Sequence, residues 1–306
     1  MYLIAPPILP IGVYGDSLKP APFEYFAPEA MEEALALMAE HGLDARPLAG
    51  GQSLVPLINM RMAQPSVLID LNRCAGLAYL REDADAFVIG PMTRQRELEL
   101  WQSLQRHCPL ISRALPYMGH ATIRNRGTVG GSLCHADPSA ELPGVAVALD
   151  AELILDGPRG RRTILATEFF LAELTTALEP DEMLCEIRFP KASDGVRASF
   201  AEVGSHFGGL AIVGVASQID ISVSGHCKRA TLAATGAGER PMRLLSTEAM
   251  LTGEILDERV ISDAAEAAAT DVEPMEDLHA SAYWRRRAVV AMTAKALREI
   301  VAQGDH

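Results

Sequence analysis

The positions of apolar and polar residues along the chain follow the helical period in some segments and the strand period in others. Met31, Leu35 and Met38 recur at helical spacing and predict a first helix. Pro28 lies at its start and Gly42 just past its end, where these residue types are favoured. By the same reasoning strands are expected at residues 46–49, 67–71, 87–89, 151–155, 162–165 and 184–189, and further helices at 54–61, at 93–118 with a break at Pro109, and at 141–149.

The last third of the chain has a different pattern. Residues 197–203, 211–221 and 229–235 alternate between apolar and polar side chains, which predicts a three-stranded antiparallel meander. Helices are expected at 257–269 and 282–301, packed on one side of this sheet. The whole pattern favours the α+β class, and no repeat with a period of 20 to 50 residues is present.

Composition limits the class of protein. The chain has 306 residues, of which 49% are hydrophobic and 22% charged, and this is typical of a globular protein with two or three subdomains. The apolar run at 145–149 is far shorter than the roughly 20 residues that cross a bilayer, so no membrane span is expected. Residues 1–20 lack the features of a signal peptide and are interpreted as an extended arm, either unstructured or laid across a partner subunit.

Charge and cysteine content exclude several functions. A formal net charge of −13 argues against nucleic acid as a partner and is common among cytoplasmic proteins, the location expected here. The basic run at 285–287 lies on a predicted helix, where a solvated or interface face is favoured. Five scattered cysteines fit neither a disulfide framework nor a metal motif, so iron–sulfur ligands are not expected on this chain.

Two segments contain adjacent glycines, Gly50-Gly51 and Gly130-Gly131. Adjacent glycines allow successive backbone N–H groups to point into one concavity and allow an anion to approach closely. Neither segment is a Walker A or Rossmann sequence, and either one alone is weak support for phosphate binding. Two such loops together suggest a pyrophosphate, with further oxygen contacts from the hydroxyls of Ser53, Thr128 and Ser132.

The loops and their neighbours resemble one known family. Residues 49–54 (AGGQSL), 70–72 (DLN), 123–132 (IRNRGTVGGS) and 135–143 (HADPSAELP) are similar to the FAD-binding medium subunit of the carbon monoxide dehydrogenase and xanthine dehydrogenase family of molybdenum hydroxylases. These motifs follow the order of the family, and the likeness extends from about residue 22 to the C-terminus.

The resemblance implies a fold of the vanillyl-alcohol-oxidase (PCMH) type. Two α+β FAD-binding subdomains would span residues 22–75 and 76–195, and a C-terminal flavoprotein subdomain 196–306, after an N-terminal extension of residues 1–21. Non-covalent FAD would have its pyrophosphate bound by Ala49, Gly50, Gly51, Gln52, Ser53, Thr128, Val129, Gly130, Gly131 and Ser132.

Other residues are expected near the cofactor. Glu141 stands where the family has an acidic contact, Leu184 where it has an apolar one, and Glu202 at a position that is lysine in some members. Asp137 follows the second loop and is expected to bind ribose hydroxyls or cap a helix. The family often has Gly-Asp-aromatic-Ala where this chain has residues 208–211, so Leu210 cannot stack on the flavin as an aromatic ring would.

Several residues beside the second loop have two interpretations. His135 could contact the cofactor or orient the loop. For Arg124 and Arg126, structural hydrogen bonds or subunit contacts are favoured over neutralisation of phosphate. Cys134 is expected to be a buried filler rather than a redox group.

The resemblance also implies partners. A large subunit would hold a molybdenum–pterin cofactor, and a small subunit with two 2Fe-2S clusters would pass electrons to the FAD of this chain and on to an external acceptor. The expected assembly is a dimer of heterotrimers. Two alternatives are a self-contained flavin oxidoreductase on the same fold, and an assembly subunit that has lost its cofactor.

Overall fold

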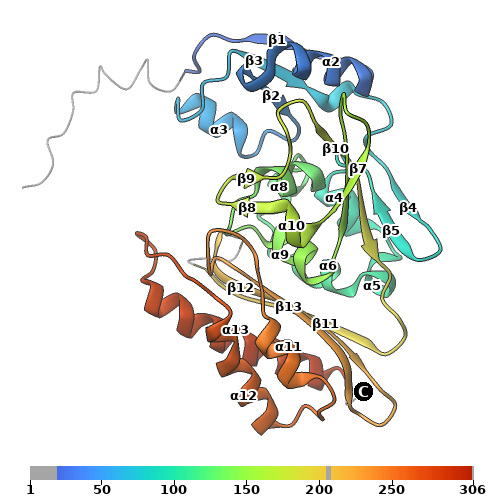
Figure 1. The fold of residues 1–306 in the computed structure, drawn as a ribbon, viewed down its shortest axis with the longest axis vertical. Coiled ribbons are helices and arrows are strands. Elements are labelled where there is room, and N and C mark those ends of the chain that lie inside the picture. Colours follow the sequence, from blue (N-terminus) through green and yellow to red (C-terminus); the bar gives the residue numbers. More distant parts are fainter. Residues whose placement is uncertain (1–18, 205–207, 305–306) are drawn as a thin grey trace, which may run out of the picture.

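The computed structural model describes residues 19–204 and 208–304, and it confirms a mixed α and β fold. Three larger sheets follow one another along the longest axis of the molecule, from the N-terminal part at one end to the C-terminal helices at the other (Figure 1). Each sheet contributes to its own cluster of buried side chains. Within the described residues, no helix is long and apolar enough to span a membrane.

The first sheet is parallel and has the order β1-β3-β2. Its middle strand, β3, has three consecutive buried residues, as expected for a strand covered on both faces. The first helix is confirmed, and it ends at Gly42, whose φ of +51° suits glycine. The elements are β1 (Glu24–Phe26), α2 (Met31–His41), a 3-10 turn (Gly42–Asp44), β2 (Ala45–Leu48), α3 (Leu54–Asn59), β3 (Val67–Asp70) and a second 3-10 turn (Leu71–Arg73).

The second sheet is antiparallel and has the order β4-β5-β10-β6-β7. The helical segment expected at 93–118 is confirmed to break next to Pro109, at Cys108, but the chain also leaves the helical conformation at Trp101, so the segment forms three short helices instead of two. The elements are β4 (Leu80–Glu82), β5 (Ala86–Ile89), α4 (Gln95–Leu100), α5 (Leu104–His107), α6 (Pro109–Ala114), α7 (Ala121–Arg124), α8 (Val129–His135), α9 (Glu141–Ala148), β6 (Glu152–Asp156), β7 (Arg162–Leu165), α10 (Ala166–Phe169), the β8–β9 hairpin (Phe170–Ala172 and Thr175–Thr176) and β10 (Met183–Pro190).

The third sheet contains the predicted meander, but it has four strands rather than three because β14 pairs with β13. Its two faces are both covered. Val215 and Ala234 face the C-terminal helices, whereas Phe200 and Ala216 belong to the core of the second sheet, whose helices α6 and α9 pack there. The elements are β11 (Val196–Gly204), β12 (Ala211–Ile221), β13 (Cys227–Thr235), β14 (Met242–Arg243), α11 (Leu245–Leu251), α12 (Glu258–Ala267), a 3-10 turn (Ala268–Thr270) and α13 (Ala282–Ala302).

The basic run on α13 is not wholly solvated, so that expectation is wrong for Arg285. Its side chain is only 6% exposed and donates to the carbonyls of Ile212 and Gly236. One of its guanidinium nitrogens also lies 2.6 Å from a carboxylate oxygen of Asp277, and this hydrogen bond is the main cause that lowers the pKa of Asp277 to about 2. Arg285 therefore anchors the start of α13 to the third sheet, while the two following arginines are exposed.

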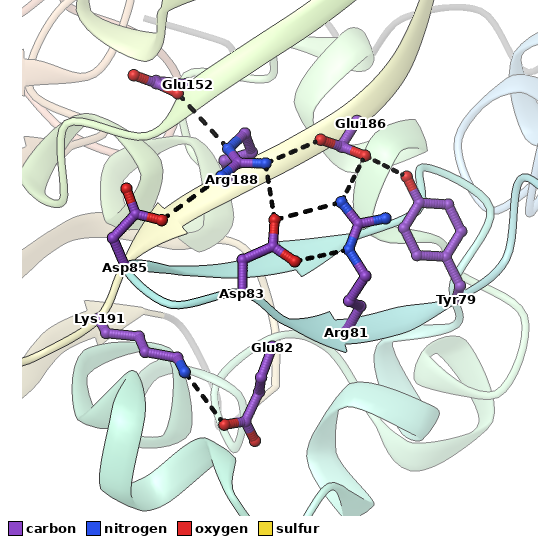
Figure 2. Close-up of polar contacts among 9 residues, drawn as sticks. All are labelled: Tyr79, Arg81, Glu82, Asp83, Asp85, Glu152, Glu186, Arg188 and Lys191. Carbon is purple, nitrogen blue, oxygen red and sulfur yellow. Dashed lines mark hydrogen bonds and ion pairs between the residues drawn. The ribbon is translucent and has the colours of Figure 1, made fainter.

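A network of charged side chains covers the outer face of the second sheet (Figure 2). Arg81 on β4 and Arg188 on β10 lie on either side of Val88, which is fully buried beneath them. Both arginines reach Asp83, at 2.9 and 3.0 Å, and both contact Glu186. The network fixes the β4–β5 hairpin, and the segment that follows this hairpin supports the second glycine loop.

Candidate functional site

The first glycine loop follows directly from β2 and cannot accommodate side chains at its centre. A Cβ atom on the buried Gly50 would lie 2.3 Å from the carbonyl oxygen of Arg126, so residue 50 must be glycine for the two loops to approach. Gly51 has a φ of +72°, which L residues rarely adopt. Sequence and structure therefore agree that this loop requires both of its glycines.

The backbone N–H groups of this loop are unpaired. No carbonyl of residues 19–204 or 208–304 accepts from the N–H of Gly50, Gly51, Gln52 or Ser53. The Gln52 side chain donates back to the carbonyl of Gly50 at 3.1 Å, which tightens the turn. Four consecutive unpaired donors at a half-exposed loop are suited to bind an anion such as phosphate.

The second loop differs from the expectation, because the N–H groups of residues 129–132 are already bonded within the protein. Gly130 donates to the carbonyl of Pro91 at 2.8 Å, and a Cβ atom on Gly130 would lie 2.5 Å from the Pro91 side chain. Gly131 donates to Thr128 Oγ1 at 3.0 Å, so Thr128 caps α8. Val129 donates to Thr93. The glycines of this loop therefore allow close packing against neighbouring residues. The hydrogen-bonding groups that remain available are the Thr128 N–H and the Ser132 hydroxyl, which bond to no other described residue.

The two loops touch each other. A Cβ atom on Gly131 would lie 3.4 Å from the Cβ of Ala49. Asn72 donates to the carbonyl of Ala49 at 2.9 Å, and Arg94 contacts both Asn72 and the carbonyl of Arg126. Sequence reasoning missed Arg94 and gave Asn72 no role, because only the fold brings β3 and α4 beside the loops.

Other residues near the second loop have clear structural roles. Arg124 is buried and bonds both carboxylate oxygens of Glu99 at 3.1 Å, so its expected structural role is confirmed. Asp137 accepts from the N–H of Ser139 at 2.8 Å and shapes the turn before α9. Burial raises the pKa of the Cys134 thiol to about 12, which suits an unreactive filler.

Two carboxyl groups are buried where α9 meets the third sheet. Glu202 on β11, Gly214 on β12 and Thr235 on β13 are cross-strand neighbours on the face that α9 covers. Glu202 Oε2 and Thr235 Oγ1 are fully buried and bond to no other described residue. Glu141, the first residue of α9, is 7% exposed.

Burial shifts the titration of both acids. Burial is the main cause that raises the pKa of Glu141 to about 8, and the nearby charges of Glu202 and Asp137 contribute to this shift. Burial also raises the pKa of Glu202 to about 7, with Lys295 opposing the shift. Both carboxyls therefore hold a proton over part of the neutral range.

The remaining predicted contacts are less accessible or lie apart. Leu184 on β10 is 4% exposed and belongs to the core of the second sheet, so little of its surface can meet a ligand. Leu210 is 63% exposed just before β12, and residues 205–207 lie outside the described part of the chain. Within residues 19–204 and 208–304, no group of His, Cys, Asp and Glu side chains is arranged to bind a metal ion.

Comparison with known proteins identifies similar chains. Residues 21–192 match the family described as the FAD binding domain in molybdopterin dehydrogenase, and residues 198–300 match the carbon monoxide dehydrogenase flavoprotein C-terminal domain.

Two relatives and one solved structure illustrate the range of the match. The 6-hydroxypseudooxynicotine dehydrogenase complex subunit alpha of Paenarthrobacter nicotinovorans is 38% identical, over 92% of this chain and 95% of the relative. The caffeine dehydrogenase subunit beta of a Pseudomonas species is 35% identical, over 92% of this chain and 95% of the relative. A structure of carbon monoxide dehydrogenase from Hydrogenophaga pseudoflava superimposes with a TM-score of 0.90 at 36% identity, covering 92% of this chain and 98% of that one.

Proposed function

Because the chain belongs to the family of FAD-binding medium subunits of molybdenum hydroxylases, with its PCMH-type fold, we propose that it transfers electrons within such a complex. In this proposal electrons come from 2Fe-2S clusters on a small subunit, pass through the FAD of this chain and leave to an external acceptor. A large molybdenum–pterin subunit completes a heterotrimer that dimerises. Relatives are named as subunits of dehydrogenases, which supports assembly with other chains.

The observation that supports cofactor binding most strongly is the run of unpaired N–H groups at Gly50–Ser53. FAD supplies the ability to accept and release electrons singly or in pairs. The pyrophosphate of FAD needs several hydrogen-bond donors, and residues 50–53 offer four in one half-exposed turn. A side chain at Gly50 would collide with the carbonyl of Arg126, and one at Gly51 would strain the backbone. The Thr128 N–H and the Ser132 hydroxyl provide donors from the second loop. The residues present therefore fit the cofactor.

The other predicted contacts keep their place in the proposal. Ala49, Val129, Gly130 and Gly131 shape the two loops, and Asp137, Glu141, Leu184 and Glu202 surround the rest of the cofactor. Glu141 and Glu202 would be protonated over part of the neutral range, which would reduce the negative charge beside the cofactor. The division at 22–75, 76–195 and 196–306 is also proposed, and it is supported by one large sheet in each range.

Purification of the native complex tests the proposed function. We expect the chain to co-purify with two other subunits and to release FAD, without a covalent bond to the protein, when the complex is denatured. A complex without flavin absorbance would overturn the proposal. Turnover of an organic substrate by this chain alone would favour the self-contained flavin oxidoreductase instead.

Replacing Leu210 with tyrosine tests the flavin surroundings. The side chain is 63% exposed at a position where the family often has an aromatic residue, so FAD content should not change. The rate of acceptor reduction should change by roughly twofold to tenfold, measured with the purified complex. Leu245→Tyr is a matched control, because Leu245 on α11 is also 63% exposed and its substitution should change neither quantity. Loss of FAD from the Leu210 variant would contradict the assignment.

A further inference from the structure

Arg94 connects the two glycine loops through a forked set of hydrogen bonds. One guanidinium nitrogen donates to Asn72 Oδ1 and another to the carbonyl oxygen of Arg126, each at 2.5 Å. Asn72 in turn donates to the carbonyl of Ala49, the first residue of the first loop. Since Arg126 immediately precedes the second loop, Arg94 fixes the spacing between the two loops.

Asn72 is itself held in place by hydrogen bonds to Asp70. Asp70, at the end of β3, accepts from the backbone N–H of Asn72 at 2.9 Å and from the Tyr25 hydroxyl at 2.5 Å. These hydrogen bonds lower the pKa of Asp70, although burial opposes the shift, so its carboxylate is ionised at neutral pH. The hydrogen-bonded chain that leads from Tyr25 through Asp70 and Asn72 to Arg94 therefore contains one ionised carboxylate, that of Asp70.

The same place contains two guanidinium groups, and neither forms an ion pair with a carboxylate of the described residues. Both acceptors of Arg94 are uncharged, and the Arg126 side chain is exposed and pairs with no described residue. The Arg126 guanidinium lies close enough to lower the pKa of both Arg94 and Asp70, although burial is the main cause for Arg94. The two guanidinium groups thus lie near each other, and the charges of two carboxylates, Glu97 and Asp70, oppose the effect of Arg126 on Arg94.

We propose that Arg94 and Arg126 form the basic part of the pyrophosphate site. Arg94 is a positioning residue that holds the two glycine loops at their working distance, and Arg126 supplies unpaired positive charge to the phosphates. Gly50 packs directly on the backbone carbonyl of Arg126, so an anion bound by the N–H groups of residues 50–53 would lie close to residue 126. The negative charge of that anion would attract both guanidinium groups. Assigning phosphate charge to Arg126 revises the sequence interpretation, which favoured structural or subunit contacts. The inference rests on the proposed FAD function.

Titration of the flavin-free full chain with FAD at low and at high salt tests the role of Arg126. Arg126→Gln should raise the Kd for FAD roughly tenfold or more and flatten its dependence on salt, because one charged contact is lost. Arg106→Gln is the matched control: it removes one exposed arginine on α5, at the far end of the second sheet (Figure 1). The control should keep both the wild-type Kd and its salt dependence.

Two variants separate the positioning role of Arg94 from its charge. Arg94→Lys keeps the charge but carries its donors on one nitrogen instead of the two separate nitrogens of the guanidinium fork. It should therefore hold the two acceptors less well, raise the Kd and retain the salt dependence. Arg94→Gln removes both the charge and the forked donors, so it should raise the Kd and also weaken the salt dependence. The Tm of each flavin-free variant shows whether folding has changed. If Arg94→Gln does not fold, the exposed Arg126 and the lysine variant still decide the question.

The outcomes are distinct. A wild-type chain that binds no FAD would overturn the proposed function and this inference with it. A wild-type chain that binds FAD, together with variants at 94 and 126 that match it in Kd and salt dependence, would overturn the inference alone. Lower Tm with unchanged Kd in both Arg94 variants would reduce Arg94 to a structural residue and overturn its positioning role.

Discussion

Replacing Gly51 with aspartate should abolish FAD retention while leaving the chain folded. The carboxylate would enter the turn whose N–H groups at residues 50–53 are unpaired, where it would accept their hydrogen bonds and repel phosphate. The fold should survive, because the new Cβ would lie 3.0 Å from Val55, an exposed side chain that can move. The φ of +72° costs an aspartate about 1 kcal/mol. The ratio of FAD to protein after purification should fall below roughly a tenth of the wild-type ratio.

A second glycine provides the control for this experiment. Gly76 has a φ of +78°, is exposed, and would place a new Cβ more than 4 Å from any other residue's atoms. Gly76→Asp therefore introduces the same charge and a similar backbone strain outside the loop, and it should retain FAD. Stoichiometric FAD in the Gly51 variant would mean that residues 49–53 form only a turn.

Gly130→Asp is a poor test of phosphate binding, although the sequence alone makes the two glycine pairs look equivalent. The side chain would overlap Pro91, so the variant should be destabilised by about 1–3 kcal/mol or more before any effect on an anion is felt. Loss of FAD would then follow from loss of packing. A thermal unfolding measurement on the flavin-free chain distinguishes the two variants.

The difference between the loops shows what the sequence can predict. Strand β2, its glycine turn and α3 follow from adjacent residues, and so do the long strands β11, β12 and β13, whose alternation is regular. In contrast, the bonding of Gly130 depends on Pro91, which lies 39 positions earlier along the chain and reaches the loop only through the β4–β5 hairpin. Adjacent glycines indicate close approach, but only tertiary structure decides whether a ligand or the protein itself approaches.

The burial of Glu141 and Glu202 likewise depends on tertiary structure and could not be predicted from the local sequence. Glu141 begins a helix that reads as small and apolar, and Glu202 occupies an alternating strand whose other face lies against α13. Nothing local indicates that both carboxyls face the junction between α9 and the third sheet. Their positions were predicted from the family resemblance, whereas their burial and raised pKa values come only from the assembled fold.

The two acids should make the flavin-free chain less stable as the pH rises from about 5 to about 8. Their folded pKa values, about 8 for Glu141 and about 7 for Glu202, are above the ~4.3 of an unfolded glutamate. The folded chain then binds more protons than the unfolded chain throughout this window, so the free energy of unfolding falls with increasing pH. The loss should be on the order of 6 kcal/mol for the pair, with Glu141 contributing more because its pKa is raised further.

Glutamine variants isolate this contribution from that of other groups. Glu141→Gln and Glu202→Gln have nearly the same shape as the protonated acids, so the double variant should be more stable than wild type at pH 8 and about equally stable at pH 5. Asp70 and Asp277, whose pKa values are lowered, lose their stabilising charge only in more acid solution, outside this window. Tm values across the range, with the exposed Glu239→Gln as control, provide the measurement. Equal pH dependence in wild type and double variant would show that these carboxyls titrate with the pKa of an ordinary glutamate and would contradict the prediction.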